Sequence, residues 1–262
     1  MKKVLLYFGS FNPVHCGHIA LAEYAIEKGI AEEVVLIVSP QNPHKETIEL
    51  AAEFARYQMC SEACQTSRYP DKIKVSAVEF TLPRPSYTID TLNFLSENFG
   101  DTMSFSILMG ADNIERFDSW KEYQKILDNY PIYVYPRKGY SLGKFEGRVT
   151  ELTDAPLFNI SATEIRGAVS RREPITDMVP PAVAAYIRDN NLWSAALYIA
   201  LLTQQLEQNP NSVEALLERG TWYFRSKEYA KARADFRQVL SIDSSNSEAQ
   251  QILDLIDELT NE

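Results

Sequence analysis

The sequence predicts an α/β protein in which helices cover both faces of a mostly parallel sheet, followed by a small all-α segment. Along the first 193 residues, short apolar runs alternate with longer segments of helical spacing, a pattern typical of parallel sheets buried on both faces. Turn-forming residues then become scarce, because nine of the ten glycines and twelve of the thirteen prolines precede residue 194. We therefore expect one domain at residues 1–193 and a helical extension at residues 194–262.

Five apolar runs are the expected strands, at residues 4–8, 34–38, 73–78, 103–109 and 132–135. In open parallel sheets, ligands bind beyond the carboxyl ends of the strands. The segments that follow residues 8, 38, 109 and 135 are therefore the expected location of a functional site.

The extension is expected to be helical throughout. Residues 213–246 resemble one 34-residue tetratricopeptide repeat, and residues 195–208 and 247–260 are the expected flanking helices. A plain helical hairpin is the alternative. A single repeat cannot bury its apolar face alone, so the flanking helices, the first domain or a second subunit must cover it. An apolar stripe in the last helix makes a homo-oligomer or a protein partner a further candidate; it consists of Ile252, Leu255, Ile256 and Leu259.

Composition excludes several classes of function. The net charge of −10 and the pI near 5.0 argue against a general nucleic-acid binder, which needs a basic surface. No apolar run is long enough to span a membrane, and the first residues do not resemble a signal peptide. Three cysteines at irregular spacing suggest no disulfide framework. We expect a cytoplasmic protein that acts on a small ligand.

The most informative segment is residues 9–18, Gly-Ser-Phe-Asn-Pro-Val-His-Cys-Gly-His, which joins the first expected strand to a helix. Amide groups at a helix N-terminus attract anions, so His15 and His18 are placed to meet a phosphate. Two solvated histidines beside a helix cap are the alternative. A zinc site is disfavoured because no accompanying ligand pattern completes a tetrahedral set. Neither a Gly-x-Gly-x-x-Gly nor a Walker-type loop occurs.

This segment resembles the HxGH nucleotidylyltransferase superfamily, in which the motif opens the first helix of a Rossmann-like sheet. Further stretches are similar to bacterial nicotinate-nucleotide adenylyltransferases over residues 1–193. They are Asn-Pro-His-Lys at 42–45, Ser-Tyr-Thr-Ile-Asp-Thr-Leu at 86–92, Met-Gly-Ala-Asp at 109–112 with Trp120 after it, and Ile-Ser-Ala-Thr-Glu-Ile-Arg at 160–166.

The resemblance implies that the 5′-phosphate of nicotinate mononucleotide attacks the α-phosphorus of ATP and releases pyrophosphate. A phosphate monoester, with its second pKa near about 6, is already anionic at neutral pH, so no general base is needed. The enzyme must align two anions and neutralise phosphate charge. The implied catalytic residues are His18 on the α-phosphate and His15, Lys45 and Arg166 on the triphosphate, with Mg²⁺ bridging its oxygens.

The same resemblance assigns the remaining contacts. The implied ATP-binding residues are Gly9, Ser10, Phe11, His15, His18, Asp112, Ser161, Thr163 and Arg166. The implied residues for the second substrate are Lys45, Thr88, Trp120 and Arg137, with Trp120 stacked on the pyridine ring.

Structural roles are open for three of these assignments. Ser161 with Glu164 also forms a capping box, Asp112 could be a helix N-cap, and Trp120 could be a core residue.

Two other functions remain open from the sequence. The same chemistry could serve another acceptor, such as nicotinamide mononucleotide, phosphopantetheine or an alcohol phosphate with CTP. Alternatively, the nucleotide domain could be an inert part of a helical scaffold. Helix N-terminal amides are also expected to lower the pKa of the Cys16 thiol, which would make it open to alkylation.

Overall fold

The computed structural model describes residues 1–40 and 50–260. These form two compact units: Met1–Ile165 with Ile175–Tyr186, and Arg166–Pro174 with Ile187–Glu262. The boundary predicted after residue 193 lies within the second unit.

The strands are β1 Lys2–Gly9, β2 Glu33–Val38, β3 Ile73–Ser76, β4 Met103–Gly110, β5 Ile132–Tyr135 and β6 Thr150–Glu151. The α-helices are α1 Cys16–Glu27, α2 Glu53–Gln65, α3 Thr88–Phe99, α4 Ala111–Ile114, α5 Tyr123–Asn129, α6 Ala162–Ser170, α7 Pro181–Asp189, α8 Ala195–Gln208, α9 Val213–Arg225, α10 Tyr229–Ile242 and α11 Ser247–Thr260.

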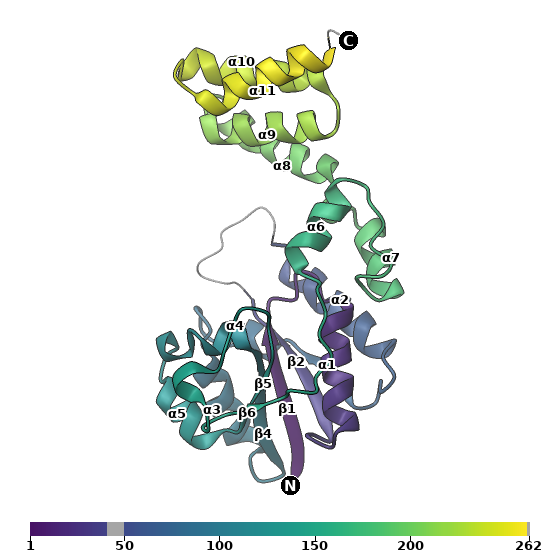
Figure 1. The fold of residues 1–262 in the computed structure, drawn as a ribbon, viewed down its shortest axis with the longest axis vertical. Helices are drawn as coiled ribbons and strands as arrows, with labels where there is room; N and C mark the ends of the chain where they lie inside the picture. Colours follow the sequence, from purple (N-terminus) through teal and green to yellow (C-terminus); the bar gives the residue numbers. More distant parts are fainter. Residues whose placement is uncertain (41–49, 261–262) are drawn as a thin grey trace. The chain divides into compact units, whose positions relative to one another are not determined.

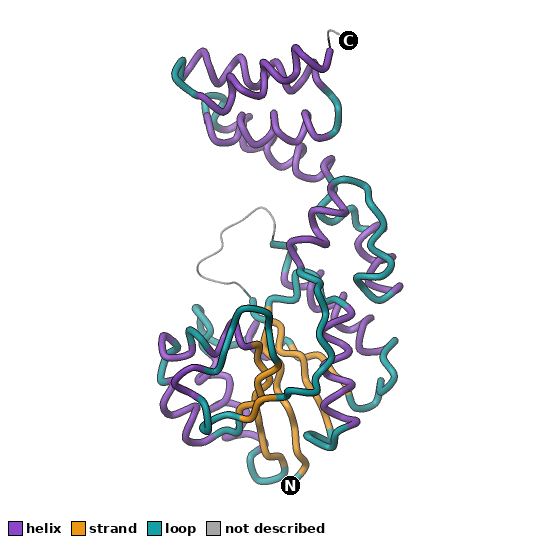
Figure 2. Tube along the Cα trace, viewed as in Figure 1, coloured by secondary structure: helices purple, strands orange, loops and turns teal. Residues whose placement is uncertain are grey.

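The first unit is built on one parallel sheet with the strand order β3-β2-β1-β4-β5-β6 (Figures 1 and 2). This order is that of a Rossmann-like sheet, so the predicted fold class is confirmed. In register, Gly9 of β1 pairs with Val38 of β2, and Gly110 of β4 pairs with Tyr135 of β5. The carboxyl ends of these four strands therefore meet at one edge of the sheet.

Helices cover both faces of this sheet. Helices α1 and α2 lie on one face, and α3, α4 and α5 lie on the other (Figure 1). Val4 and Leu6 of β1 belong to the core on the α3 side, while the alternate residues Leu5 and Tyr7 are also buried. Because both faces are covered, the strands appear in the sequence as continuous apolar runs rather than as alternating ones.

Two strand predictions need correction. The third strand ends at Ser76 rather than at residue 78, because Val78–Phe80 form a 3-10 turn. The sixth strand, Thr150–Glu151, was not predicted. Two exposed residues are too few to show a strand period, and β6 exists only through its pairing with β5.

Arg56 of α2 fixes the loops at the carboxyl edge of the sheet. Its side chain is fully buried and donates to four backbone carbonyls. Nε donates to Ala51 at 2.9 Å, Nη1 to Ser10 at 2.6 Å and to Ser39 at 2.7 Å, and Nη2 to Pro40 at 2.5 Å. Since a buried charge is tolerated only when its donors are satisfied, this guanidinium holds the ends of the loops that follow β1 and β2.

The second unit contains the helices α8 to α11. The side chains of Ser194 and Ser212 cap α8 and α9 by accepting hydrogen bonds from backbone amides. Trp222 of α9 stacks on Tyr198 of α8, with ring centroids 4.4 Å apart. Arg219 of α9 forms a two-pronged ion pair with Asp235 of α10, at 2.8 and 2.7 Å. Among the described residues, no helix is both long and apolar enough to cross a membrane.

Candidate active site

The turn between β1 and α1 forms the centre of the site. Phe11 has a φ of +45°, a conformation that a bulky residue adopts only when its surroundings impose it. Its ring is buried against Tyr7 and His18, with centroids 5.7 and 5.1 Å apart. Gly17 permits close packing on the other side, because a Cβ there would lie 3.1 Å from Phe158 Cβ. The turn is therefore fixed by packing on both sides.

His15 and His18 lie together at the start of α1. Their rings stack, with centroids 3.6 Å apart and planes inclined by 27°. The backbone N–H of His15 donates to Nδ1 of His18 at 3.1 Å. Because Nδ1 is thus an acceptor, the neutral His18 ring carries its proton on Nε2. The alternative of two solvated histidines is excluded for His15, which is 5% exposed.

Both imidazoles are held neutral. Burial, with a contribution from Arg137, lowers the pKa of His15 from 6.5 to about 4. Burial, followed by the charges of His15 and Arg137, lowers the pKa of His18 well below 6.5. Protonation of both stacked rings would cost free energy, because like charges repel and burial removes the water that stabilises them. An incoming anion would reverse this effect by stabilising the protonated form.

A second cluster joins β1, β4 and β5. Tyr7 donates its hydroxyl hydrogen to Tyr135 at 3.1 Å, and Arg137 Nη2 lies 3.5 Å from the same Tyr135 oxygen. Arg137 Nε lies 3.6 Å from Asp112 Oδ1. A Cβ at Gly110 would lie only 2.2 Å from this carboxylate oxygen, so the glycine makes room for Asp112. Asp112 is in α4, whose N-cap is Gly110, which excludes Asp112 as the cap.

Most of the predicted site residues line one cavity of about 600 Å³, which we call the polar cavity. Carboxylates, hydroxyls and imidazoles contribute much of its wall. The predicted residues that line it are Gly9, Ser10, Phe11, His15, His18, Thr88, Asp112, Trp120, Arg137 and Ser161.

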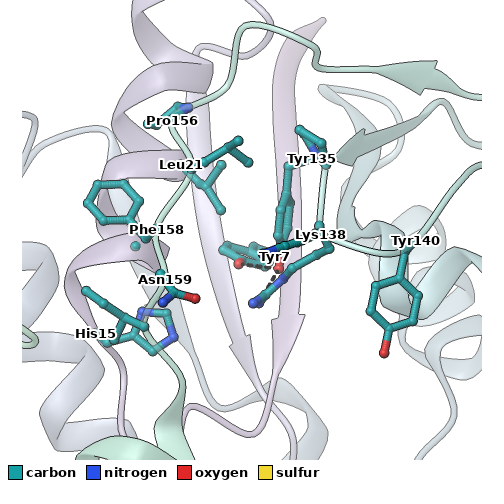
Figure 3. Close-up of a pocket in the computed structure, with 14 residues that line it drawn as sticks. Tyr7, His15, Leu21, Tyr135, Lys138, Tyr140, Pro156, Phe158 and Asn159 are labelled. Atoms are coloured by element: carbon teal, nitrogen blue, oxygen red, sulfur yellow. Dashed lines mark hydrogen bonds between the residues drawn. The ribbon is translucent and has the colours of Figure 1, made fainter.

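A neighbouring cavity of about 670 Å³, which we call the aromatic cavity, opens on the other side of His15. Figure 3 shows Phe158 and Asn159 on one side and Lys138 and Tyr140 on the other. The two cavities share five residues, Tyr7, His15, Tyr135, Arg137 and Ile160. The histidine and arginine side chains therefore stand where the two spaces meet.

Three predicted residues are not part of this wall. Lys45 lies outside the described residues. Thr163 is on the exposed first turn of α6 and does not line either cavity. Arg166 is further along α6, in the second compact unit. The Ser161 cap is confirmed, because the Glu164 amide donates to Ser161 Oγ at 3.1 Å.

Sequence reasoning missed several lining residues. Tyr7 and Tyr135 stand within strand runs that read as core, and only their hydroxyl groups distinguish them from aliphatic residues. Phe158 and Asn159 belong to an irregular segment without a motif. Glu79, which no sequence motif singled out, lines the polar cavity and is only 3% exposed.

The expected lowering of the Cys16 pKa is wrong. Burial raises the pKa of this thiol, a backbone hydrogen bond opposes that effect, and the carboxylate of Asp177 raises the pKa further. The Cys16 amide, moreover, donates to the Met178 carbonyl at 2.9 Å. This first-turn N–H is therefore unavailable to a ligand.

A known family and several known proteins resemble this chain. The cytidylyltransferase-like family matches residues 6–168. A protein of Cytophaga hutchinsonii named probable nicotinate-nucleotide adenylyltransferase is 39% identical over 193 residues, which cover 73% of this chain and 98% of that protein. A protein of the same name from Bacteroides fragilis is 40% identical over 182 residues, covering 69% and 89% respectively. The structure of Plasmodium falciparum nicotinic acid mononucleotide adenylyltransferase complexed with NaAD is 19% identical, with a TM-score of 0.63 and coverage of 74% of this chain and 98% of that one.

The chain therefore belongs to the cytidylyltransferase-like family of nucleotidyltransferases. Within it, the two bacterial relatives place the chain among the nicotinate-nucleotide adenylyltransferases. The Plasmodium structure, at its lower identity, supports the fold. The two bacterial relatives cover 73% and 69% of this chain.

The buried imidazole pair predicts an unusual titration. His15 and His18 should both remain neutral at about pH 5.5, where an ordinary histidine is mostly protonated. Each histidine has a lower pKa in the folded than in the unfolded protein. The stability that each contributes is therefore present above about pH 6.5, the unfolded pKa, and is lost as the pH falls through the folded pKa, which is about 4 for His15. NMR titration of the imidazole signals, assigned with His15→Gln and His18→Gln, measures both values. A midpoint near 6.5 for either ring would contradict the account.

Proposed function

We propose that this protein transfers the adenylyl group of ATP to nicotinate mononucleotide, giving the deamido dinucleotide and pyrophosphate in NAD biosynthesis. The observation that carries the proposal is the pair of adjoining cavities that meet at His15 and Arg137. A reaction that joins two nucleotides through their phosphates needs two such spaces with a shared phosphate region. The names of the bacterial relatives support the same activity.

The adenosine of ATP would occupy the aromatic cavity. Tyr140 and Phe158 provide apolar surface there, and aromatic side chains are suited to contact a purine. The triphosphate would then extend from this cavity to the start of α1. Ser161, Ser10 and Gly9 line the polar cavity nearby.

His15, His18 and Arg137 would act on the phosphates. The phosphate oxygen of nicotinate mononucleotide forms a bond to the α-phosphorus, while the bond from that phosphorus to the bridging oxygen of pyrophosphate breaks. His18 would donate Nε2–H to the α-phosphate, where charge is stabilised during transfer. Arg137 would supply a permanent positive charge, since Tyr135 and Asp112 raise its pKa despite the opposing effect of burial.

Nicotinate mononucleotide would occupy the polar cavity. Trp120 packs edge-on against Phe117, with centroids 5.4 Å apart, and also lines the cavity, so it is both supported by the core and open to a ligand. Thr88 is the first residue of α3. Its hydroxyl and the adjoining helix amides would suit the ring carboxylate.

Mg²⁺ would enter as part of the ATP substrate. Within residues 1–40 and 50–260, no group of three His, Cys, Asp or Glu side chains is arranged to hold a metal ion, and Asp112 already pairs with Arg137. Mg²⁺ keeps several waters and binds phosphate oxygens readily. The ion would neutralise charge on the triphosphate, while Lys45, Thr163 and Arg166 remain proposed contacts of the phosphates.

The direct test is pyrophosphate release by the purified protein with ATP and Mg²⁺. Nicotinate mononucleotide and its amide are supplied in parallel. We expect release with the acid, and much slower release with the amide, because discrimination depends on donors placed for a carboxylate. Faster release with the amide would overturn the substrate assignment, and no release with either would contradict the proposed function.

Replacement of His18 tests the catalytic assignment. His18→Ala should lower kcat by about a hundredfold or more, the effect of removing a donor to transition-state charge. His18→Gln should lose less, because its amide can place an N–H near the position of Nε2. Thermal unfolding of both variants shows that they fold. Normal turnover of His18→Ala would exclude the assignment.

For the C-terminal helices, we propose a single tetratricopeptide-like repeat at residues 213–246 that docks a second copy or a protein partner. Helices α9 and α10 support the repeat, since a Cβ at Gly220 would lie 3.0 Å from the Phe236 ring, a close approach typical of such helix pairs. Leu255 and Leu259 of α11 are exposed. The proposed contact surface is therefore on the last helix.

Sedimentation of the full chain tests this docking. We expect either a mass above that of the monomer at micromolar concentration or a stable complex with a partner. Leu255→Glu with Leu259→Glu should abolish the association while leaving pyrophosphate release intact. A monomer at all concentrations that binds no partner would contradict the proposal.

A further inference from the structure

Glu79 is a buried carboxyl group in the wall of the polar cavity. It belongs to the 3-10 turn Val78–Phe80 and is 3% exposed. Thr91 Oγ1 donates to Glu79 Oε1 at 2.9 Å, and Ser86 Oγ donates to Oε2 at 3.2 Å. The hydroxyl of Ser39 is a third hydrogen-bonding partner. One carboxyl group thus joins the end of β2, the segment before α3 and the first turns of α3.

The Ser86 hydroxyl that bonds to Glu79 belongs to the segment that would meet the pyridine ring. Ser86 and Thr88 line the polar cavity with Glu79 and Trp120, whereas Thr91 is fully buried and does not line it. Lys121, which follows Trp120, pairs with Asp90 of α3 at 3.0 Å. The start of α3 is therefore hydrogen-bonded to Glu79 through Thr91, and the ion pair links it to the segment that carries Trp120.

A carboxylate in this position has a definite effect on its partners. An ionised carboxyl group accepts only, so every hydroxyl that bonds to it must point its hydrogen toward it. The hydroxyl lone pairs of Ser86 and Ser39 then point away from Glu79. The hydrogen bonds to Glu79 also restrain the backbone of these two residues. Burial raises the pKa of Glu79, and the hydrogen bonds from Thr91, Ser39 and Ser86 act in the opposite direction.

We propose that Glu79 is a positioning residue for the pyridine end of the acceptor, holding segment 86–88 at the distance from Trp120 that the ring requires. This inference rests on the proposed function, because it assigns the pyridine nucleotide to the polar cavity. Glu79 lines only the polar cavity, whereas His15 and Arg137, which would act on the phosphates, line both cavities. Its loss should therefore affect acceptor binding more than ATP binding.

The test is steady-state kinetics of Glu79→Gln with both substrates varied. Glutamine keeps the size of the side chain but replaces one acceptor oxygen by an NH₂ donor, so it cannot accept from all three hydroxyls. We expect the KM for nicotinate mononucleotide to rise about tenfold or more, the effect of losing a hydrogen bond to a charged group. The KM for ATP should change less than about twofold, within the scatter of a substitution remote from its site.

Thr91→Val supplies a second and independent measurement. It removes one donor to Glu79 without altering the cavity wall, so the KM for the acceptor should rise in the same direction but by less. In the double variant, the rise in the KM for the acceptor should be smaller than the product of the two single-variant rises, because both substitutions disrupt one hydrogen-bonded unit. Independent, multiplicative effects would contradict the assignment.

Glu23→Gln is the matched control. Glu23 is another buried carboxylate, 8% exposed, which accepts from Arg68 N and Nε at 2.8 Å and lines neither cavity. Its replacement should lower thermal stability and leave both KM values unchanged. If folded Glu79→Gln behaves like this control, the positioning role is excluded. If the wild-type protein releases no pyrophosphate with either acceptor, the proposed function fails and the inference fails with it.

Discussion

The buried guanidinium of Arg56 is the interaction on which the geometry of the site depends most. The sheet aligns the ends of β1 and β2, but loops beyond a strand end have no ladder to hold them. Arg56 supplies that restraint through the carbonyls of Ser10, Ser39 and Pro40. The restraint works both ways, because the buried guanidinium would itself lose its partners if these loops moved, and an unpaired buried polar group costs about 1–3 kcal/mol. The polar cavity receives Ser10 and Ser39 from these same loops.

The electrostatics of the site suit anionic ligands. Among the described residues, the wall of the polar cavity has two neutral imidazoles and one guanidinium that is shared with Asp112, so it does not carry a concentrated positive charge. A phosphate that approaches His15 and His18 favours their protonated forms, and the charge that it needs therefore develops as it binds. The stack of the two rings limits this response, since protonation of one ring disfavours protonation of the other.

Parts of the fold and site could be predicted because local patterns encode them. The runs before Gly9 and Gly110 identified strands whose ends meet, and the segment at residues 9–18 identified the turn that carries His15 and His18. Long-range contacts could not be predicted in this way. Nothing near Glu79 in the sequence indicates that Ser39 and Thr91 will surround it, and strand β6 is too short to produce a period. The low pKa of His15 also depends on Arg137, which is more than a hundred residues away.

A structure of the protein bound to the deamido dinucleotide would test the central claim most directly. We expect the adenosine in the aromatic cavity beside Phe158 and Tyr140, the pyridine ring against Trp120 in the polar cavity, and the two phosphates at His15, His18 and Arg137. Both cavities would then be filled by one molecule that crosses their junction. Binding of the dinucleotide within a single cavity, or with its phosphates away from the histidine pair, would contradict the account.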